Sequence, residues 1–384
     1  MRFFCSQGQT HIILKYFLFL LIFPSLSIIH FFQNPEAICF AMINWPVYNT
    51  PIDDDSVDIV YLWVNGSDPL WQKYFLYSAK KYNLKMKKKQ FDARFIEGDE
   101  LKYSLRSIEM FVLHFIRYVF LIVPNFNTQI PCWLNTSHPQ IKILFLRDIF
   151  PLPIPEEYRN DPNSVFIFNS NSIDNIIPSI PNLADKFIYM NDDYFFGNRV
   201  EKSDFFDEDG RPKMIVNTHN FRNAYREYQK LEILSRNDFA GNNFNAVITG
   251  TVSLIQKKLN FSANLDLYHV AHPYRKDLWK EALMIFGKEI NETIASPFRA
   301  AKDIQAGMLS LQFGLYRNQI IPIQFQKTFA HFVILWSQRD LKELKEIAEQ
   351  RPKMFCINCD NANLVSQNQM FLSSYFPNKS SFEL

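Results

Sequence analysis

The sequence predicts an α/β fold with a Rossmann-like, mainly parallel sheet flanked by helices. Short apolar runs rich in β-branched and aromatic residues alternate with longer stretches whose apolar residues recur at helical spacing. Polar clusters directly follow two of the apolar runs, as expected where functional residues gather at the carboxyl ends of parallel strands. The length of 384 residues suits one large domain or two small ones.

The elements follow from these patterns. The first expected strand covers residues 57–64 and ends in the turn-forming run Asn65-Gly-Ser-Asp-Pro69. Further strands are expected at 118–123, 141–146, 165–168 and 187–190, and helices at 71–89, 100–115, 277–286, 300–316 and 340–349. Residues 198–260 are polar and are expected to be rich in loops.

The N-terminal region differs from the rest of the chain. Residues 12–32 are almost wholly apolar, and their core is about long enough to cross a thin bilayer. Arg2 and Lys15 precede the apolar core at 16–32, and the next Lys or Arg after it is Lys73, which predicts a single-pass type II orientation. A signal peptide cleaved near residues 37–41 and a buried N-terminal helix remain alternatives.

The expected organisation is therefore a cytosolic tail and signal anchor at 1–35 and a linker at 36–56. The main folded domain would cover 57–365, followed by a C-terminal tail at 366–384. A formal net charge of +2 lacks the basic excess of a nucleic-acid binder, so no nucleic-acid partner is expected. The single CxxC motif Cys356-Ile-Asn-Cys359 has no second cysteine pair nearby and does not predict a structural zinc. A disulfide involving Cys132, Cys356 or Cys359 is compatible with an oxidising compartment.

The run Asn191-Asp192-Asp193 follows the apolar stretch 187–190 and is the most informative polar cluster. Two adjacent carboxylates repel each other, and burying them unpaired is costly. A divalent cation removes both problems, and these hard oxygen ligands suit Mg²⁺ or Mn²⁺, which also hold phosphate oxygens. The alternative is structural, with one Asp capping a helix and the other in an ion pair.

Two histidines and two arginines are further candidates. His269 and His272 fall within a run of four residues. A neutral imidazole can take a proton from a sugar hydroxyl near pH 7. Packing residues or metal ligands are the alternatives for this pair. Arg299 and Arg106 carry the planar donor fork that holds phosphate, although each alone also fits a surface ion pair.

These segments together resemble the Stealth family of sugar-phosphate transferases. The resemblance covers roughly residues 57–361 in four blocks: the run from Val57 to Asp68, the segments of 100–193 that include Glu100-Leu-Lys-Tyr-Ser-Leu-Arg106 and Asn169, the run from His269 to Lys276 with Arg299 and Asp303, and Phe355-Cys-Ile-Asn358 with Asp360. The fourth block departs from the family pattern because Cys359 falls between Asn358 and Asp360, which is either a one-residue insertion or a lost carboxylate.

The resemblance implies transfer of a sugar-1-phosphate, most simply GlcNAc-1-phosphate, from a UDP-sugar to a hydroxyl of a glycan or glycoprotein. Asp192, Asp193 and Asp360 would hold Mg²⁺ or Mn²⁺, and His269 would be the general base, with His272 in reserve. The remaining expected site residues are Arg299 and Arg106 on phosphate, Asn65, Gly66 and Asp68 at the nucleotide, and Glu100, Asn169 and Asp303 near the site.

Two other functions compete with this one. A metal-dependent glycosyltransferase could use the same donor and the same acidic pair, and would release UDP rather than UMP. A non-catalytic sugar-binding protein predicts loss of the acidic pair or the histidine, and both are present. A eukaryotic source would place the domain in the Golgi or ER lumen, and a bacterial source at the membrane or in the cytoplasm.

Overall fold

The computed structural model describes residues 53, 55–84, 97–150, 167–235 and 242–384. A five-stranded sheet in the order β3-β2-β1-β4-β8 forms its centre, and all neighbouring pairs are parallel except β4 with β8. These strands are β1 Val57–Leu62, β2 Val119–Val123, β3 Ile141–Phe145, β4 Lys186–Asn191 and β8 His272–Arg275. The predicted α/β class with a mainly parallel sheet is therefore confirmed.

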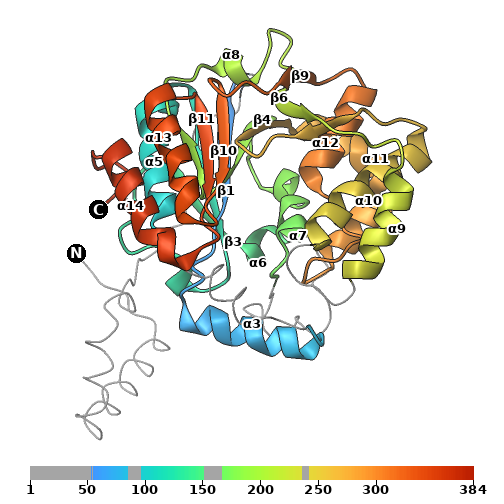
Figure 1. Ribbon diagram of the computed structural model, residues 1–384, viewed down its shortest axis with the longest axis horizontal. Helices are drawn as coiled ribbons and strands as arrows, with labels where there is room; N and C mark the ends of the chain where they lie inside the picture. Colours follow the sequence, from blue (N-terminus) through green and yellow to red (C-terminus); the bar gives the residue numbers. More distant parts are fainter. Residues whose placement is uncertain (1–52, 54, 85–96, 151–166, 236–241) are drawn as a thin grey trace, which may run out of the picture.

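Both faces of the central sheet are covered, as parallel sheets require. Val60 of β1 enters a core built with α10 (Asn242–Leu259), α11 (Lys276–Ile294) and α12 (Ala306–Tyr316). Ile59 and Tyr61 point to the opposite face, where α5 (Glu100–Phe111) packs. Figure 1 shows α5 on one side of the sheet and α10 to α12 on the other.

Two small sheets extend this core. The first has the order β10-β11-β5 (Ala330–Ile334, Met354–Asn358 and Tyr194–Phe196), and the second has the order β7-β6-β9 (Leu265–Leu267, Lys213–Thr218 and Ile321–Gln324). Helices α13 (Leu341–Gln350) and α14 (Val365–Tyr375) lie beside α5 in Figure 1 and pack on the first small sheet. The segment expected as a C-terminal tail thus contains most of α14, and Phe382 near its end is fully buried.

The acidic run joins two sheets. β4 belongs to the central sheet, and β5 belongs to the first small sheet, so Asp192 and Asp193 form the turn that passes between them. The backbone amide of Ile357 in β11 donates to the Asp193 carbonyl across 3.1 Å. This turn is therefore held from both sides by strands.

A buried ion pair lies at the amino ends of the central strands, opposite the end that carries the acidic turn. Asp58 in β1 is fully buried, and its carboxylate accepts from the Arg117 guanidinium at 2.9 Å and from the backbone amides of Tyr118 at 3.1 Å and Ala184 at 2.7 Å. Because these partners precede β2 and β4, the carboxylate ties the amino ends of three strands together. These hydrogen bonds compensate the buried carboxylate for its loss of hydration, as a buried charge requires.

Some expectations about local structure are wrong. Residues 198–260 are not mainly loops, since they contain β6, α9 (Ala224–Ser235) and α10, besides the short α8 (Lys202–Phe205). The expected helix at 71–89 is α3 (Pro69–Lys81), and its remainder partly falls outside the described residues. The described part of the expected strand at 165–168 is not a strand. Two further short helices flank this region in the sequence, α6 (Leu146–Ile149) and α7 (Ser170–Asp174).

The expected membrane anchor lies outside the described residues. Among the helices that are described, none has both the length and the apolar character needed to cross a bilayer. Cys132 is disulfide-bonded, whereas Cys356 and Cys359 are free thiols.

Candidate active site

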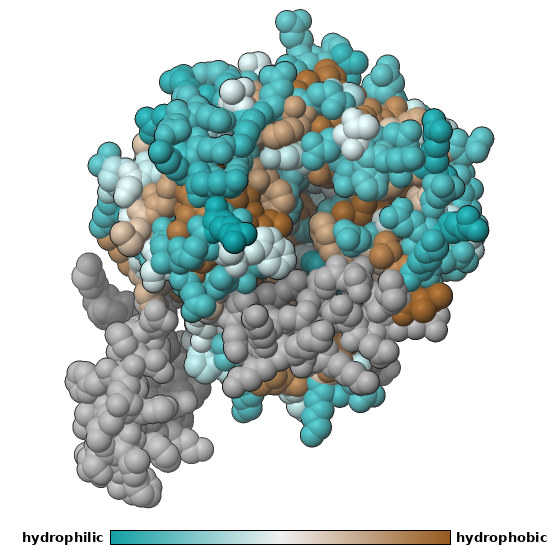
Figure 2. Space-filling model, viewed as in Figure 1, coloured by the Kyte–Doolittle hydropathy of each residue, from teal (hydrophilic) through white to brown (hydrophobic). Residues whose placement is uncertain are grey.

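A cavity of about 510 Å³ opens at the carboxyl ends of the parallel strands. Its wall takes residues from the loops that follow β1, β2, β3, β4 and β11, which is where the sequence pattern predicted the functional residues. Figure 2 shows the molecule hollowed near the middle of this face. The site residues predicted from sequence that line the cavity are Gly66, Glu100, Asp192, Asp193, His269, Arg299 and Asp360.

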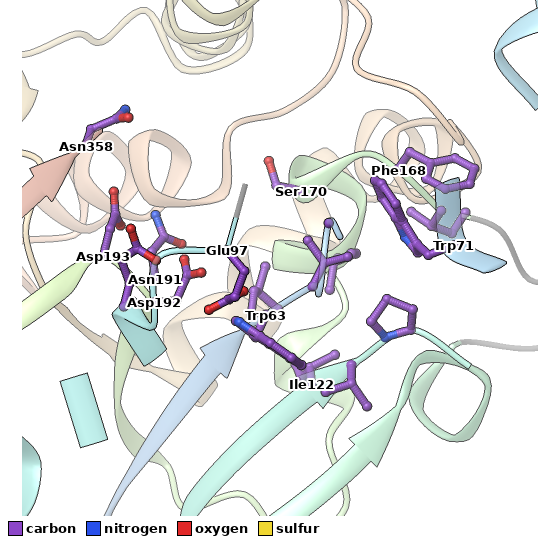
Figure 3. A pocket seen from close by; sticks show the side chains of 18 of the residues that line it. Trp63, Trp71, Glu97, Ile122, Phe168, Ser170, Asn191, Asp192, Asp193 and Asn358 are labelled. Atoms are coloured by element: carbon purple, nitrogen blue, oxygen red, sulfur yellow. The ribbon is translucent and has the colours of Figure 1, made fainter. Parts of the chain in front are cut away.

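The acidic turn forms one wall of this cavity (Figure 3). Burial and the neighbouring Asp193 raise the pKa of Asp192 to about 7. Burial likewise raises the pKa of Asp193 to about 7. Asp193 Oδ2 accepts a hydrogen bond from the Cys356 thiol at 3.4 Å, while Asp193 Oδ1 is buried with no hydrogen-bond partner among the described residues. Such a wall favours a ligand that neutralises carboxylates.

Two glutamates add to the negative charge. Burial and nearby Asp192 raise the pKa of Glu97 to about 8 and that of Glu100 to about 7. Figure 3 shows the Glu97 carboxylate close to Asp192. Sequence reasoning missed Glu97, although it begins the acidic run Glu97-Gly-Asp-Glu100 directly before α5.

The divergent fourth block lies beside the acidic turn. Asn358, Cys359 and Asp360 all line the cavity at the end of β11. In β11, Cys356 pairs with Tyr194 of β5, so the register of this small sheet places the block next to Asp193. Asp360 therefore keeps a carboxylate at the site in spite of the additional cysteine.

The two histidines have different surroundings. His269 lines the cavity, and its Nδ1 lies 3.1 Å from the Tyr194 hydroxyl. Burial lowers the pKa of His269 to about 4, so the imidazole is neutral at pH 7 and can accept a proton. His272 lies in β8, is 6% exposed and is not part of the cavity wall, and burial together with His269 lowers its pKa to about 3. Position therefore favours His269 over His272 as the base.

Arg299, which was expected from the sequence to hold phosphate, lies in the cavity wall. Its guanidinium donates to the Ser170 hydroxyl at 2.8 Å, and both residues line the cavity. Asp303 accepts from the backbone amide of Ala300 and from the side-chain amide of Asn169, each at 2.8 Å. Asn169 and Asp303 thus fix the loop that carries Arg299, and neither belongs to the cavity wall itself.

The far wall of the cavity is aromatic. Figure 3 shows Trp71 and Phe168 across the cavity from the acidic side chains, with Ser170 between the two walls. The two rings meet edge to face with centroids 5.5 Å apart, and Phe75 packs against both. The cavity therefore has an acidic end, a cationic residue on its wall and an apolar end.

The first block has a supporting role. Asp68 is 5% exposed, and its carboxylate accepts from the backbone amide of Leu70 at 2.9 Å, the Thr128 hydroxyl at 2.6 Å and the Gln129 amide at 2.8 Å. The side chain of Asn65 closes a turn by accepting from the backbone amide of Ser67 at 3.0 Å. These side chains shape the loop, and Gly66 is the member of the predicted trio that lines the cavity.

Arg106 does not contribute to the cavity wall, contrary to the expectation from sequence. Its guanidinium makes two 2.8 Å hydrogen bonds to the Glu383 carboxylate and one of 2.9 Å to the carbonyl of Phe376. Arg106 therefore fastens the C-terminal segment to α5, and its donors are directed away from any phosphate in the cavity.

The cavity residues fit a divalent cation. Asp193 has an orphaned buried oxygen, and burial first, with repulsion between the carboxylates second, raises the pKa values of four neighbouring carboxyl groups, both of which a cation would offset. The ligand atoms of Asp193, His269 and Cys356 lie within 4.8 Å of one another.

Three conserved regions of the Stealth proteins match this chain in order: conserved region 1 at residues 55–73, region 2 at 94–214 and region 3 at 268–315. The chain belongs to the Stealth family. These regions contain Gly66, the acidic turn, His269 and Arg299, so the matched segments supply much of the cavity wall. The resemblance recognised in the sequence is therefore confirmed for its first three blocks, and the block at 355–360 lies outside the matched regions.

Among Stealth relatives, a capsular polysaccharide phosphotransferase of Haemophilus influenzae is 27% identical over 342 residues, covering 85% of each chain. An exopolysaccharide phosphotransferase of Lactiplantibacillus plantarum is 26% identical over 85% of this chain and 96% of its own length. Another from Streptomyces coelicolor is 27% identical, and the match spans 33% of that longer protein. Among solved structures, the galactosyltransferase LgtC aligns with a TM-score of 0.39 at 9% identity, covering 84% of this chain and 96% of that one.

Proposed function

We propose that this Stealth protein transfers a sugar-1-phosphate from a nucleotide-sugar donor to a hydroxyl of a glycan, forming a phosphodiester. The observation that carries the proposal is the meeting of Asp192-Asp193, His269 and Arg299 in one cavity with an aromatic far wall. The phosphotransferase names of the relatives support the same reaction class. UDP-GlcNAc is the donor we would test first.

The donor would lie along the cavity. Asp192 and Asp193, with Asp360 beside them, are the groups that would hold Mg²⁺ or Mn²⁺. When bound, such a cation screens the charge of the donor diphosphate. Arg299 would hold a phosphate oxygen with its planar donors, and Ser170 would keep the guanidinium in place.

The nucleoside would occupy the aromatic end. Trp71 and Phe168 offer ring surface on the side of the cavity away from the carboxylates. Stacking of a base on an aromatic side chain contributes about 1–3 kcal/mol and tolerates different bases. This end of the cavity therefore supports binding of a nucleotide without deciding which base it carries.

His269 would act on the acceptor. Its imidazole is neutral at pH 7, because burial lowers its pKa to about 4, so it can take the proton of the attacking hydroxyl. The hydroxyl oxygen then bonds to the phosphorus that carries the sugar, and the bond from that phosphorus to the bridging oxygen breaks. The nucleoside monophosphate leaves with the bridging oxygen. For Nε2 to be the acceptor, Nδ1 must carry its proton toward the Tyr194 hydroxyl, 3.1 Å away.

The nucleotide product tests this proposal. We would incubate the full chain with UDP-GlcNAc, Mg²⁺ or Mn²⁺ and a panel of glycan acceptors, and separate the nucleotides by chromatography. Release of UMP that depends on both metal and acceptor supports the transfer of a sugar phosphate. Release of UDP would replace it with the alternative function, metal-dependent glycosyl transfer from the same donor.

A further inference from the structure

Three different metal-binding side chains meet behind one wall of the cavity: Asp193 and His269 line it, and the fully buried Cys356 lies beside them. The ligand atoms of Asp193, His269 and Cys356 all lie within 4.8 Å of one another. Asp193 lies in the turn between β4 and β5, Cys356 in β11, and His269 just before β8. Because each donor is attached to a strand or to a tight connection between strands, the group is preorganised rather than assembled from mobile surface residues.

The spacing within the group suits a small tetrahedral ion. The Cys356 Sγ lies 3.4 Å from Asp193 Oδ2. Zinc bonds of about 2.3 Å to sulfur and about 2.1 Å to oxygen at a tetrahedral angle place those two atoms about 3.6 Å apart. Cys356 is fully buried and forms no disulfide, so its thiol is shielded from solvent and points to the Asp193 carboxylate.

The ligand chemistry distinguishes this group from the carboxylate site of the proposed transfer, although the two share Asp193. Magnesium and manganese favour oxygen ligands, whereas thiolate and imidazole select zinc. We propose that Asp193, His269 and Cys356 bind Zn²⁺, and that zinc bound there inhibits the enzyme. The inhibition, but not the binding, rests on the proposed function.

The inhibition follows from which groups the zinc ion would occupy. Coordination of His269 takes the lone pair that would accept the acceptor proton, and coordination of Asp193 removes a carboxylate from the activating cation. Binding converts the Cys356 thiol to a thiolate, and its proton passes to the solvent. Zinc affinity should therefore rise with pH.

Two neighbouring features provide controls. Cys359 is a free, half-buried thiol that lines the same cavity but is not part of the three-residue group, so it is the matched cysteine. A second possible group, His331 with Glu343 and Glu346, contains no sulfur, and Lys327 already pairs with both of its carboxylates. A readout specific to sulfur therefore reports only on cysteine sites.

Cobalt supplies such a readout, because Co²⁺ replaces Zn²⁺ in tetrahedral sites and a Co²⁺–thiolate bond adds a near-ultraviolet charge-transfer band. We would titrate the metal-free full chain with Co²⁺ and follow absorbance. The expected result is a thiolate band in the wild type and in Cys359→Ser, abolished by excess Zn²⁺ and missing in Cys356→Ser. Absence of the band from the wild type, its loss in Cys359→Ser, or its persistence in folded Cys356→Ser would overturn the site. Because Cys5 and Cys39 also lie in the full chain, a Cys356 variant is needed to assign the band, and Cys356→Ala replaces Cys356→Ser if the serine variant folds poorly.

Inhibition is measured separately at saturating Mg²⁺. We expect Cys356→Ser to need at least about tenfold more zinc than the wild type for half-inhibition, each compared with its own uninhibited rate. Equal inhibition of both proteins would overturn the inhibitory role. If no transfer is detected with any acceptor, the proposed function fails while the cobalt titration still decides the zinc site.

Discussion

The backbone amide of Ile357 donates to the carbonyl of Asp193 across 3.1 Å, and this bond joins strand β11 to the acidic turn. The two residues are 164 positions apart in the sequence (357 − 193). Because of this contact, Asn358 and Asp360 enter the same cavity as Asp192 and Asp193. The spacing of the acidic groups is thus set by strand pairing, which makes it a stable feature of the metal-free protein.

The acidic wall predicts how stability depends on pH. Burial raises the pKa of Asp192, Asp193 and Glu100 to about 7 and that of Glu97 to about 8, so the folded state binds more protons than the unfolded state in this range. Stability contributed by these groups is full below their unfolded pKa values and is lost as pH rises through about 7–8.

Between pH 6.5 and 8.5 the metal-free protein should therefore lose at least about 3 °C in melting temperature, measured by scanning calorimetry. Asp192→Asn should lose less over the same interval, because it removes one of the repelling charges. Mg²⁺ should raise the melting temperature more at pH 8.5 than at pH 6.5. A larger Mg²⁺ effect at the lower pH would contradict this account.

His269 and His272 should separate chemistry from stability. His269→Gln removes the proposed base at the cavity wall, and we expect the turnover number to fall about 10²–10⁴-fold with donor affinity little changed. His272→Gln alters a buried position in β8, so the principal effect should be on melting temperature. Steady-state kinetics and thermal melts of both variants check this assignment, which fails if His272→Gln is the variant with the greater loss of turnover.

Arg299 should act on donor binding. Arg299→Lys keeps the positive charge but removes the planar fork, and we expect the KM for the nucleotide sugar to rise about tenfold. The matched variant is Arg106→Lys, whose guanidinium lies outside the cavity wall, and the donor KM of that variant should stay within about twofold of the wild type. Equal changes in the donor KM of the two variants would contradict the placement of Arg299 at the donor.

Arg106 should act on the C-terminal segment. Its side chain and that of Glu383 are mostly buried, and a charge-assisted hydrogen bond typically contributes about 1.5–3 kcal/mol. Arg106→Ala should therefore lower the free energy of unfolding by a similar amount and speed proteolysis after residue 375. Glu383→Gln should produce a smaller change in the same direction, because the amide oxygen can still accept one of the hydrogen bonds.

The aromatic end of the cavity should contribute to nucleotide affinity. Phe168 lines the cavity and is only half-buried, so Phe168→Leu removes ring surface while keeping an apolar side chain. We expect UMP to bind about tenfold more weakly by calorimetry, in line with the contribution of base stacking, and inorganic phosphate inhibition to be unchanged. An unchanged UMP affinity would place the nucleoside elsewhere in the cavity.

Much of the site was predictable because its residues form local patterns. An apolar strand followed directly by Asp192-Asp193 indicates that these carboxylates lie at the carboxyl end of the sheet, where functional residues gather. Gly66 after β1 was placed at the cavity by the same reasoning. Arg106 was not predictable, since its partner Glu383 lies 277 residues away and no local pattern distinguishes a phosphate ligand from an ion pair.

The roles of other residues also depend on tertiary contacts. Asp68, Asn169 and Asp303 lie near the site, and their polar atoms bind backbone and side-chain groups of the loops they support. The helix α10 was hidden because buried polar residues, including Thr249 and Thr251, are interspersed with its buried apolar residues Val247, Val252 and Ile255. Glu97 was missed because its position relative to Asp192 depends on tertiary folding.

The most direct test of the account follows the phosphorus atom. UDP-GlcNAc labelled with ³²P in the phosphate attached to the sugar would be incubated with the full chain, Mg²⁺ and the glycan acceptor that supports turnover, with Asp193→Asn in parallel. Sugar-phosphate transfer predicts that the label moves to the glycan and that unlabelled UMP is released. Label that remains entirely in UDP while the glycan gains GlcNAc would contradict the account.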